Sequence, residues 1–151
     1  TFNPALTIGE QVTESSVLHG ILSKEQAHER AKVLYQALEL PDPERLGRRY
    51  PHQVSGGQLQ RLMAAMALCG KPDLLVLDEP SAGLDARARR SVIDVLKKRN
   101  GAILVATHDL ELAAEMARRA IVLDEGRLVY DGSLDELLKN EEMLYRHGLK
   151  A

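Results

Sequence analysis

Two acidic side chains follow a short apolar segment in the middle of the chain. Residues 74–77 read LLVL, and Asp78 and Glu79 come next. A carboxylate at the carboxyl end of a strand suits Mg²⁺, which one or two carboxylates usually hold together with phosphate oxygens and water. A second carboxylate beside it can orient or deprotonate an attacking water. Taken alone, the pair is more typical of a plain polar strand exit, so it needs support from other positions.

Two other short segments have a composition suited to phosphate chemistry. Residues 55–58 read SGGQ at the start of an expected helix, where glycine N–H groups can approach an anion closely and the helix N-terminus adds partial positive charge. The same string also occurs as an ordinary flexible loop with a helix cap. After the apolar run 103–106, His108 could hydrogen-bond a phosphate or a water. The simpler alternative is that Thr107 or Asp109 caps a helix and His108 is exposed.

The elements that must position these residues fall into two groups. The first 69 residues are predicted to be helical: capping boxes open helices at Thr7 and Ser23, and residues 41–54 hold three prolines and connect to the next helix with at most one helical turn. That next helix, about 57–69, has apolar residues at helical spacing. These are Leu59, Leu62, Met63, Met66 and Ala67.

From residue 73 onward, strands and helices alternate. The unbroken apolar run at 74–77 predicts a parallel strand covered on both faces. The alternation predicts an α/β fold with a mostly parallel sheet. The expected elements are a helix from Asp85 to about Arg99, a strand at 103–106, a helix at about 109–118, a strand at 120–123 that turns into a hairpin, and a C-terminal helix that a capping box opens at Ser133.

The composition narrows the class of protein. Twenty Lys and Arg against 22 Asp and Glu give a net charge of −2, which argues against a nucleic-acid binder that uses a basic face. The single cysteine, Cys69, excludes an intramolecular disulfide and is expected to be a small buried residue. The histidines show no metal-ligand spacing and no cysteine partner, which argues against zinc. No apolar run is long enough to span a bilayer, so we expect a soluble, cytosolic chain.

Four motifs in order give the chain a family resemblance. Residues 55–61 (SGGQLQR), 74–80 (LLVLDEP), 81–85 (SAGLD) and 107–109 (THD) resemble the signature motif, Walker B, D-loop and H-loop of ATP-binding cassette (ABC) transporter ATPase subunits. Residues 3–10 look like the segment after that family's Q-loop, so the resemblance covers the whole chain. The departures are mild: Val54 and Ser81 stand where leucine and threonine are commoner.

The resemblance implies part of a P-loop NTPase domain. Residues 1–69 would be the α-helical ABC subdomain with the signature motif, and residues 70–151 the C-terminal part of the RecA-like parallel core. A Walker A loop, Gly-x-x-x-x-Gly-Lys-Ser/Thr, is absent from the sequence, because Pro72 follows Gly70 and Lys71. The antiparallel β-subdomain and the Q-loop glutamine are absent as well. We therefore expect a longer native protein and little ATPase activity from these residues alone.

The resemblance also implies a role for each motif residue. In the family, two domains pair head to tail, and each ATP lies between Walker A of one and the signature of the other. Asp78 would position Mg²⁺, and Glu79 and His108 would act on the water and the γ-phosphate. The residues that would contact the ATP of the partner or couple the two sites are Ser55, Gly56, Gly57, Gln58 and Asp85.

The implied function is import driven by ATP. The partners would be a second ABC ATPase subunit, identical or different, and transmembrane permease subunits, with no nucleic acid, at the cytoplasmic face of the cell membrane. The N-terminal third looks like the peptide and nickel importers, and the C-terminal part like cobalt and vitamin importers of the energy-coupling-factor type. The alternatives are a non-transport ABC ATPase of the repair or translation type, or a fragment that serves only dimerisation. The repair type carries long heptad arms before the signature, and no heptad run occurs here.

Overall fold

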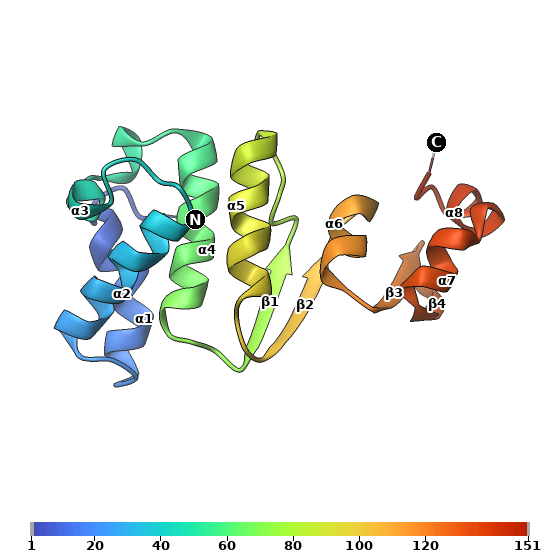
Figure 1. Cartoon of the computed structure of the whole chain (residues 1–151), viewed down its shortest axis with the longest axis horizontal. Coiled ribbons are helices and arrows are strands. Elements are labelled where there is room, and N and C mark those ends of the chain that lie inside the picture. Colours follow the sequence, from blue (N-terminus) through green and yellow to red (C-terminus); the bar gives the residue numbers. More distant parts are fainter. Residues whose placement is uncertain (1, 151) are drawn as a thin grey trace. The chain divides into compact units, whose positions relative to one another are not determined.

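The chain forms two compact units. The computed structural model describes residues 2–150, and its contacts divide the chain into Thr1–Leu104 and Val105–Ala151 (Figure 1). The predicted division into a helical subdomain, 1–69, and an ATPase core, 70–151, is a functional one and stays a prediction.

The first two helices begin at the predicted capping boxes. α1 (Ile8–Leu18) and α2 (Lys24–Ala37) follow Thr7 and Ser23, whose hydroxyls accept the third helical N–H while the Glu10 and Gln26 side chains accept the N–H of the cap residue. Four apolar residues at helical spacing along α2 and just after it are all buried. They are Ala27, Ala31, Leu34 and Leu38.

The connector before the signature contains more structure than predicted. It forms two short turns, α3 (Pro43–Leu46) and η1 (Pro51–Gln53), rather than one at most. The Gly9 N–H donates to Gly47 O at 2.9 Å, and a Cβ on Gly9 would lie 2.8 Å from that oxygen. Only a glycine lets α1 approach the connector this closely, and the bond satisfies one of the orphan N–H groups at the start of α1.

α4 (Gly56–Cys69) is the central helix of the first unit and packs against α1, α2 and α5. Its buried face is rotated from the predicted stripe. Met63 is exposed, and Leu59, Met66 and Ala67 are only half-buried, because the neighbouring helices cover a different face of α4. The fully covered residues are Leu62, Ala64, Ala65, Leu68 and Cys69. The prediction that Cys69 is buried is confirmed, and Arg30 donates to its carbonyl at 2.8 Å at the end of the helix.

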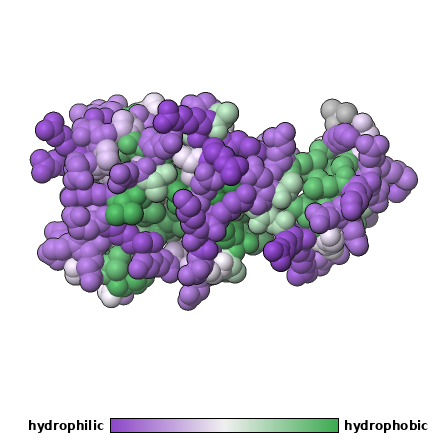
Figure 2. All heavy atoms as spheres, viewed as in Figure 1, coloured by the Kyte–Doolittle hydropathy of each residue, from purple (hydrophilic) through white to green (hydrophobic). Residues whose placement is uncertain are grey.

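A small sheet follows α4. β1 (Leu74–Asp78) pairs with β2 (Ala102–Ala106), both strands run in the same direction, and α5 (Ala86–Lys97) connects them (Figure 1). The predicted burial on both faces is wrong. Leu75 is buried, but Leu74, Val76 and Leu104 are exposed, because no element of the first unit, as described over residues 2–104, covers them. Figure 2 shows hydrophobic residues in green at several places on the face of the molecule that it displays.

The second unit contains a hairpin and three short helices. After α6 (Leu110–Met116), β3 (Arg119–Asp124) pairs antiparallel with β4 (Arg127–Ser133) alone, so the third strand does not extend the β1–β2 sheet. The predicted tight turn is confirmed, with Glu125 and Gly126 both at positive φ.

The C-terminal segment differs from the prediction in two ways. It forms two helices, α7 (Leu134–Lys139) and α8 (Glu141–Arg146), because Asn140 ends the first and caps the second through Met143 N at 3.1 Å. Ser133 precedes α7 without a side-chain cap, so the predicted capping box is wrong. Val122, Leu134, Leu137 and Leu144 form the core of this unit.

Candidate functional site

The acidic pair lies at the carboxyl end of β1. Asp78 is the last residue of the strand and is exposed, and Glu79 follows it and is half-buried. Glu79 has a φ of 44°, in the left-handed region that non-glycine residues rarely occupy. The chain therefore turns sharply at Glu79, so Asp78 and Glu79 do not simply alternate along an extended strand.

The segment after Glu79 is a pair of tight turns that ends in a helix cap. Ala82 N donates to Glu79 O at 3.1 Å, and Leu84 N donates to Ser81 O at 3.3 Å. Asp85 then accepts from Ala88 N at 2.8 Å and caps α5, as predicted. The carboxylate of Asp85 is thus engaged with its own helix, while the residue remains exposed.

The signature segment forms the N-terminus of α4. Ser55 is the cap, and its hydroxyl accepts from Gln58 N at 3.3 Å. The Gln58 carboxamide in turn accepts from Ser55 N at 2.9 Å. The structure therefore places Gln58 in a capping box, where its Oε1 accepts from Ser55 N and its Nε2 is a donor that can contact a ligand without breaking this bond.

The two glycines of this helix start are not needed by the packing of the chain. Gly56 is in helical backbone, and a Cβ built on it would meet no atom within 4 Å. A Cβ on Gly57 would lie 3.9 Å from Leu84 Cδ2, an ordinary contact distance. Glycine lowers helix stability by roughly 0.5–1 kcal/mol relative to alanine. A close approach by something outside this chain would explain why both positions lack a side chain.

α4 also contacts the acidic turn directly. Gln60 Nε2 donates to Glu79 O at 3.3 Å, and this contact is partly buried. The structure thus brings the signature helix and Glu79 together within the first unit. No role was predicted for Gln60, although a polar residue among the apolar residues of this helix was a signal for such a contact.

His108 lies in the other compact unit. It follows β2 and is exposed, between Thr107 and Asp109. Asp109 accepts from Leu112 N at 2.9 Å and caps α6, so the simpler prediction for the residues around His108 is confirmed. The structure describes His108 within its own unit, and its proposed contact with a phosphate remains a prediction.

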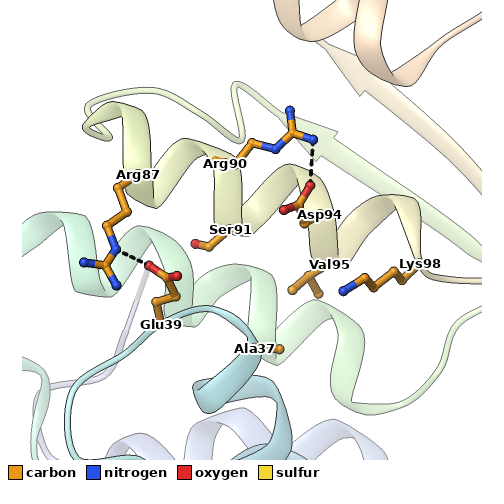
Figure 3. Close-up of a pocket in the computed structure, with 8 residues that line it drawn as sticks. All are labelled: Ala37, Glu39, Arg87, Arg90, Ser91, Asp94, Val95 and Lys98. Atoms are coloured by element: carbon orange, nitrogen blue, oxygen red, sulfur yellow. Dashed lines mark hydrogen bonds and ion pairs between the residues drawn. The ribbon is translucent and has the colours of Figure 1, made fainter.

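An ion-paired network surrounds the first helical turns of α5. Arg61 of α4 donates to Leu38 O and Glu39 O at 2.9 Å, and the Glu39 carboxylate accepts from Arg87 at 2.5 Å. The hydrogen bond to Glu39 raises the pKa of Arg87 above its usual value. The side chains of α5 and the end of α2 line a surface cavity of about 340 Å³ here (Figure 3). None of the predicted site residues lines it, and Figure 3 shows two of its arginines, Arg87 and Arg90, paired with Glu39 and Asp94.

The assignment of Asp78 to Mg²⁺ stays a prediction, with which an exposed carboxylate at a strand end is compatible. Within residues 2–150, no three His, Cys, Asp or Glu side chains gather into a cation site. Mg²⁺ in phosphate-transfer sites keeps several waters and uses one or two carboxylates plus phosphate oxygens, so one exposed carboxylate at the strand end suffices. The same described residues include no helix of the length and apolar character that crossing a bilayer requires.

Known proteins match this chain along most of its length. The oligopeptide transport ATP-binding protein AppD of Bacillus subtilis (strain 168) is 39% identical over 99% of the chain and 47% of its own length. OppD of Lactococcus lactis subsp. cremoris (strain SK11), which has the same description, is 35% identical over 97% of the chain and 45% of its own length. The chain therefore spans less than half the length of these curated relatives.

A solved structure shares the fold. The ATP-binding cassette MJ0796, described as a dimer in a post-hydrolysis state bound to ADP and Pi, superposes with a TM-score of 0.76. It is 30% identical, and the match covers 89% of this chain and 59% of that one. The family model described as ABC transporter matches residues 1–82, more than half of the 151. This chain belongs to the ABC transporter family.

Proposed function

We propose that this chain is the signature and Walker B part of an ATP-hydrolysing ABC transporter subunit that works as a pair. The observation that carries the proposal is the start of α4, where two glycines stand at helical positions that the packing of the chain would allow to hold side chains. Together with family membership, this supports a binding site at the N-terminus of α4 for a phosphate of the nucleotide that a second subunit holds.

The helix start supplies the donors for that contact. The first turn of a helix has N–H groups without helical partners, and glycines let an anion come close to them. Ser55 and Gly56 are exposed, so the nucleotide of a partner can reach both. Ser55 would contribute its hydroxyl, and Gln58 would contribute its Nε2 donor while its Oε1 still accepts from Ser55 N. The dimer of MJ0796 supports the paired arrangement.

The end of β1 supplies the groups that act on the nucleotide of the chain's own subunit. Asp78 would hold Mg²⁺, which supplies charge compensation for the phosphates. Glu79 would orient the attacking water and accept its proton. Glu79 directly follows Asp78 at the carboxyl end of β1, and its φ of 44° turns the chain there. His108 would contact the γ-phosphate, and Asp85 would link the two nucleotide sites of the dimer.

The names of the relatives support a peptide cargo. AppD and OppD are both described as oligopeptide transport ATP-binding proteins, so we propose oligopeptide import rather than metal or vitamin import. The membrane partners would be permease subunits, and the chain would act at the cytoplasmic face of the membrane. Leu18, Ile21 and Val33 are exposed on or beside α1 and α2, and apolar side chains there are suited to contact with a permease.

The test is Glu79→Gln in the ATPase that contains these residues together with a Walker A loop. Loss of a general base lowers turnover by about 100-fold or more, so we expect slow hydrolysis with ATP binding retained. The matched control is Glu14→Gln, which neutralises an exposed glutamate of α1 and should leave turnover unchanged. An unimpaired rate in the Glu79→Gln variant contradicts the proposed base.

A further inference from the structure

The contact between Gln60 and Glu79 joins two motifs that are far apart in the sequence. Gln60 lies on the second turn of α4, five residues after the cap Ser55, and its Nε2 donates to Glu79 O at 3.3 Å. Ala82 N donates to the same oxygen at 3.1 Å. The carbonyl of Glu79 therefore receives one donor from its own turn and one from the signature helix.

Glu79 needs such support because its backbone conformation is unfavourable. A left-handed conformation costs a non-glycine residue on the order of 1 kcal/mol, and the surrounding bonds must maintain it. The φ of Glu79 is 44°. Because the carbonyl carbon and the Cβ are both bonded to the same Cα, holding the carbonyl restricts the direction of the Cα–Cβ bond from which the Glu79 side chain extends.

α4 also lies against the far end of the same turn. A Cβ on Gly57 would be 3.9 Å from Leu84 Cδ2, so Leu84 lies close to the first turn of α4. The segment from Glu79 to Leu84 is thus held at its start by Gln60 and contacted near its end beside Gly57.

We infer that Gln60 is a positioning residue that holds the Glu79 backbone in the orientation the general base requires. This inference rests on the proposed function, because it concerns the same Glu79. It also connects the two nucleotide sites through one chain. The N-terminus of α4 would contact the nucleotide of the partner, and Gln60 on the same helix would position Glu79, the base that acts on the chain's own nucleotide. Engagement of Ser55–Gly57 would then change the position of Glu79 through α4.

The experiment measures kcat and KM for ATP in the complete ATPase with Gln60→Met, which keeps the length and helix propensity of the side chain but removes its donor. Losing one neutral hydrogen bond in the active conformation should lower kcat about fivefold and leave KM unchanged. Gln60→Lys keeps an N–H donor and should retain kcat within about twofold. Gln36→Met, on the exposed face of α2, is the matched control and should keep wild-type kcat.

Two further measurements separate positioning from a general loss of structure. The thermal unfolding midpoint is measured for every variant, and Gln60→Glu provides a second donor-free side chain of the original size. Wild-type kcat in either folded donor-free variant overturns the inference. So does a Gln60→Lys variant with the same defect as Gln60→Met.

A double variant distinguishes failure of this inference from failure of the proposed function. In a Glu79→Gln background the base is already lost, so Gln60→Met should change the residual rate by less than about twofold. A full fivefold loss in that background means that Gln60 acts independently of Glu79, which overturns the inference alone. A normal rate for Glu79→Gln itself contradicts the proposed function.

Discussion

At the scale of single residues, Gly56 allows stability and activity to be separated. Gly56→Ala places a methyl group at a helical position with no atom within 4 Å, so it should raise the free energy of unfolding by about 0.5 kcal/mol. The same methyl group would occupy the space that the nucleotide of the partner subunit approaches, so ATP turnover should fall. Chemical denaturation and a steady-state ATPase assay of the complete ATPase, which includes a Walker A loop, measure the two effects. A variant that is more stable and fully active would show that nothing approaches Gly56.

Residue types predicted the site, but not how its members are held. The sequence indicated Asp78, Glu79 and the helix start at Ser55, because carboxylates after an apolar run and glycines at a cap have recognisable chemistry. It did not predict that Gln58 bonds back to Ser55 or that Gln60 reaches Glu79. Those contacts depend on the rotation of α4 about its axis, which the neighbouring helices set and which local spacing does not determine.

At the scale of elements, local sequence signals predicted helix starts that depend on one segment, but they did not predict burial, which depends on packing between segments. Capping residues at Thr7, Ser23 and Asp85 began helices as predicted, because an N-cap satisfies its own first turn. Ser133 fits the same pattern, yet its side chain makes no cap. The apolar run at 74–77 was predicted to be covered on both faces, but burial requires a second layer, and residues 2–104 of the first unit place none over Leu74 and Val76.

In the turn between α5 and β2, Gly101 is expected to be important for the stability of the fold. Gly101 has a φ of 97°, and a Cβ there would lie 2.4 Å from Asp73 O. That oxygen also accepts from Ala102 N at 2.8 Å, which fixes the start of β2 beside β1. Gly101→Ala therefore combines an unfavourable φ with a backbone clash and should lower the free energy of unfolding by about 2 kcal/mol or more.

Gly20→Ala provides the control for this turn. Gly20 also has positive φ, at 66°, but a Cβ on it would meet no atom within 4 Å. Its alanine variant should cost only the conformational penalty of about 1 kcal/mol. Urea denaturation of both variants measures the difference. Equal losses would mean that the close approach of Gly101 to Asp73 does not matter for stability.

At the scale of the whole molecule, the proposed dimer predicts that two inactive variants restore each other. Each nucleotide would be served by Glu79 of one chain and Ser55 of the other, so Glu79→Gln or Ser55→Arg inactivates both sites of a pair of identical chains. In a mixed pair, one site receives both substitutions and the other receives neither. Random mixing makes half of the pairs mixed, each with one intact site, so activity should recover to about a quarter of wild type. Sites built within single chains would recover nothing, because every chain in the mixture carries a defect.

The experiment uses the two variants of the complete ATPase, purified with different tags and mixed in equal amounts. The ATP turnover of the mixture is compared with that of each variant alone. A double variant that carries both substitutions on one chain, mixed with wild-type chains, should give inactive mixed pairs, because each site then has one defect. Only the head-to-tail arrangement produces both outcomes.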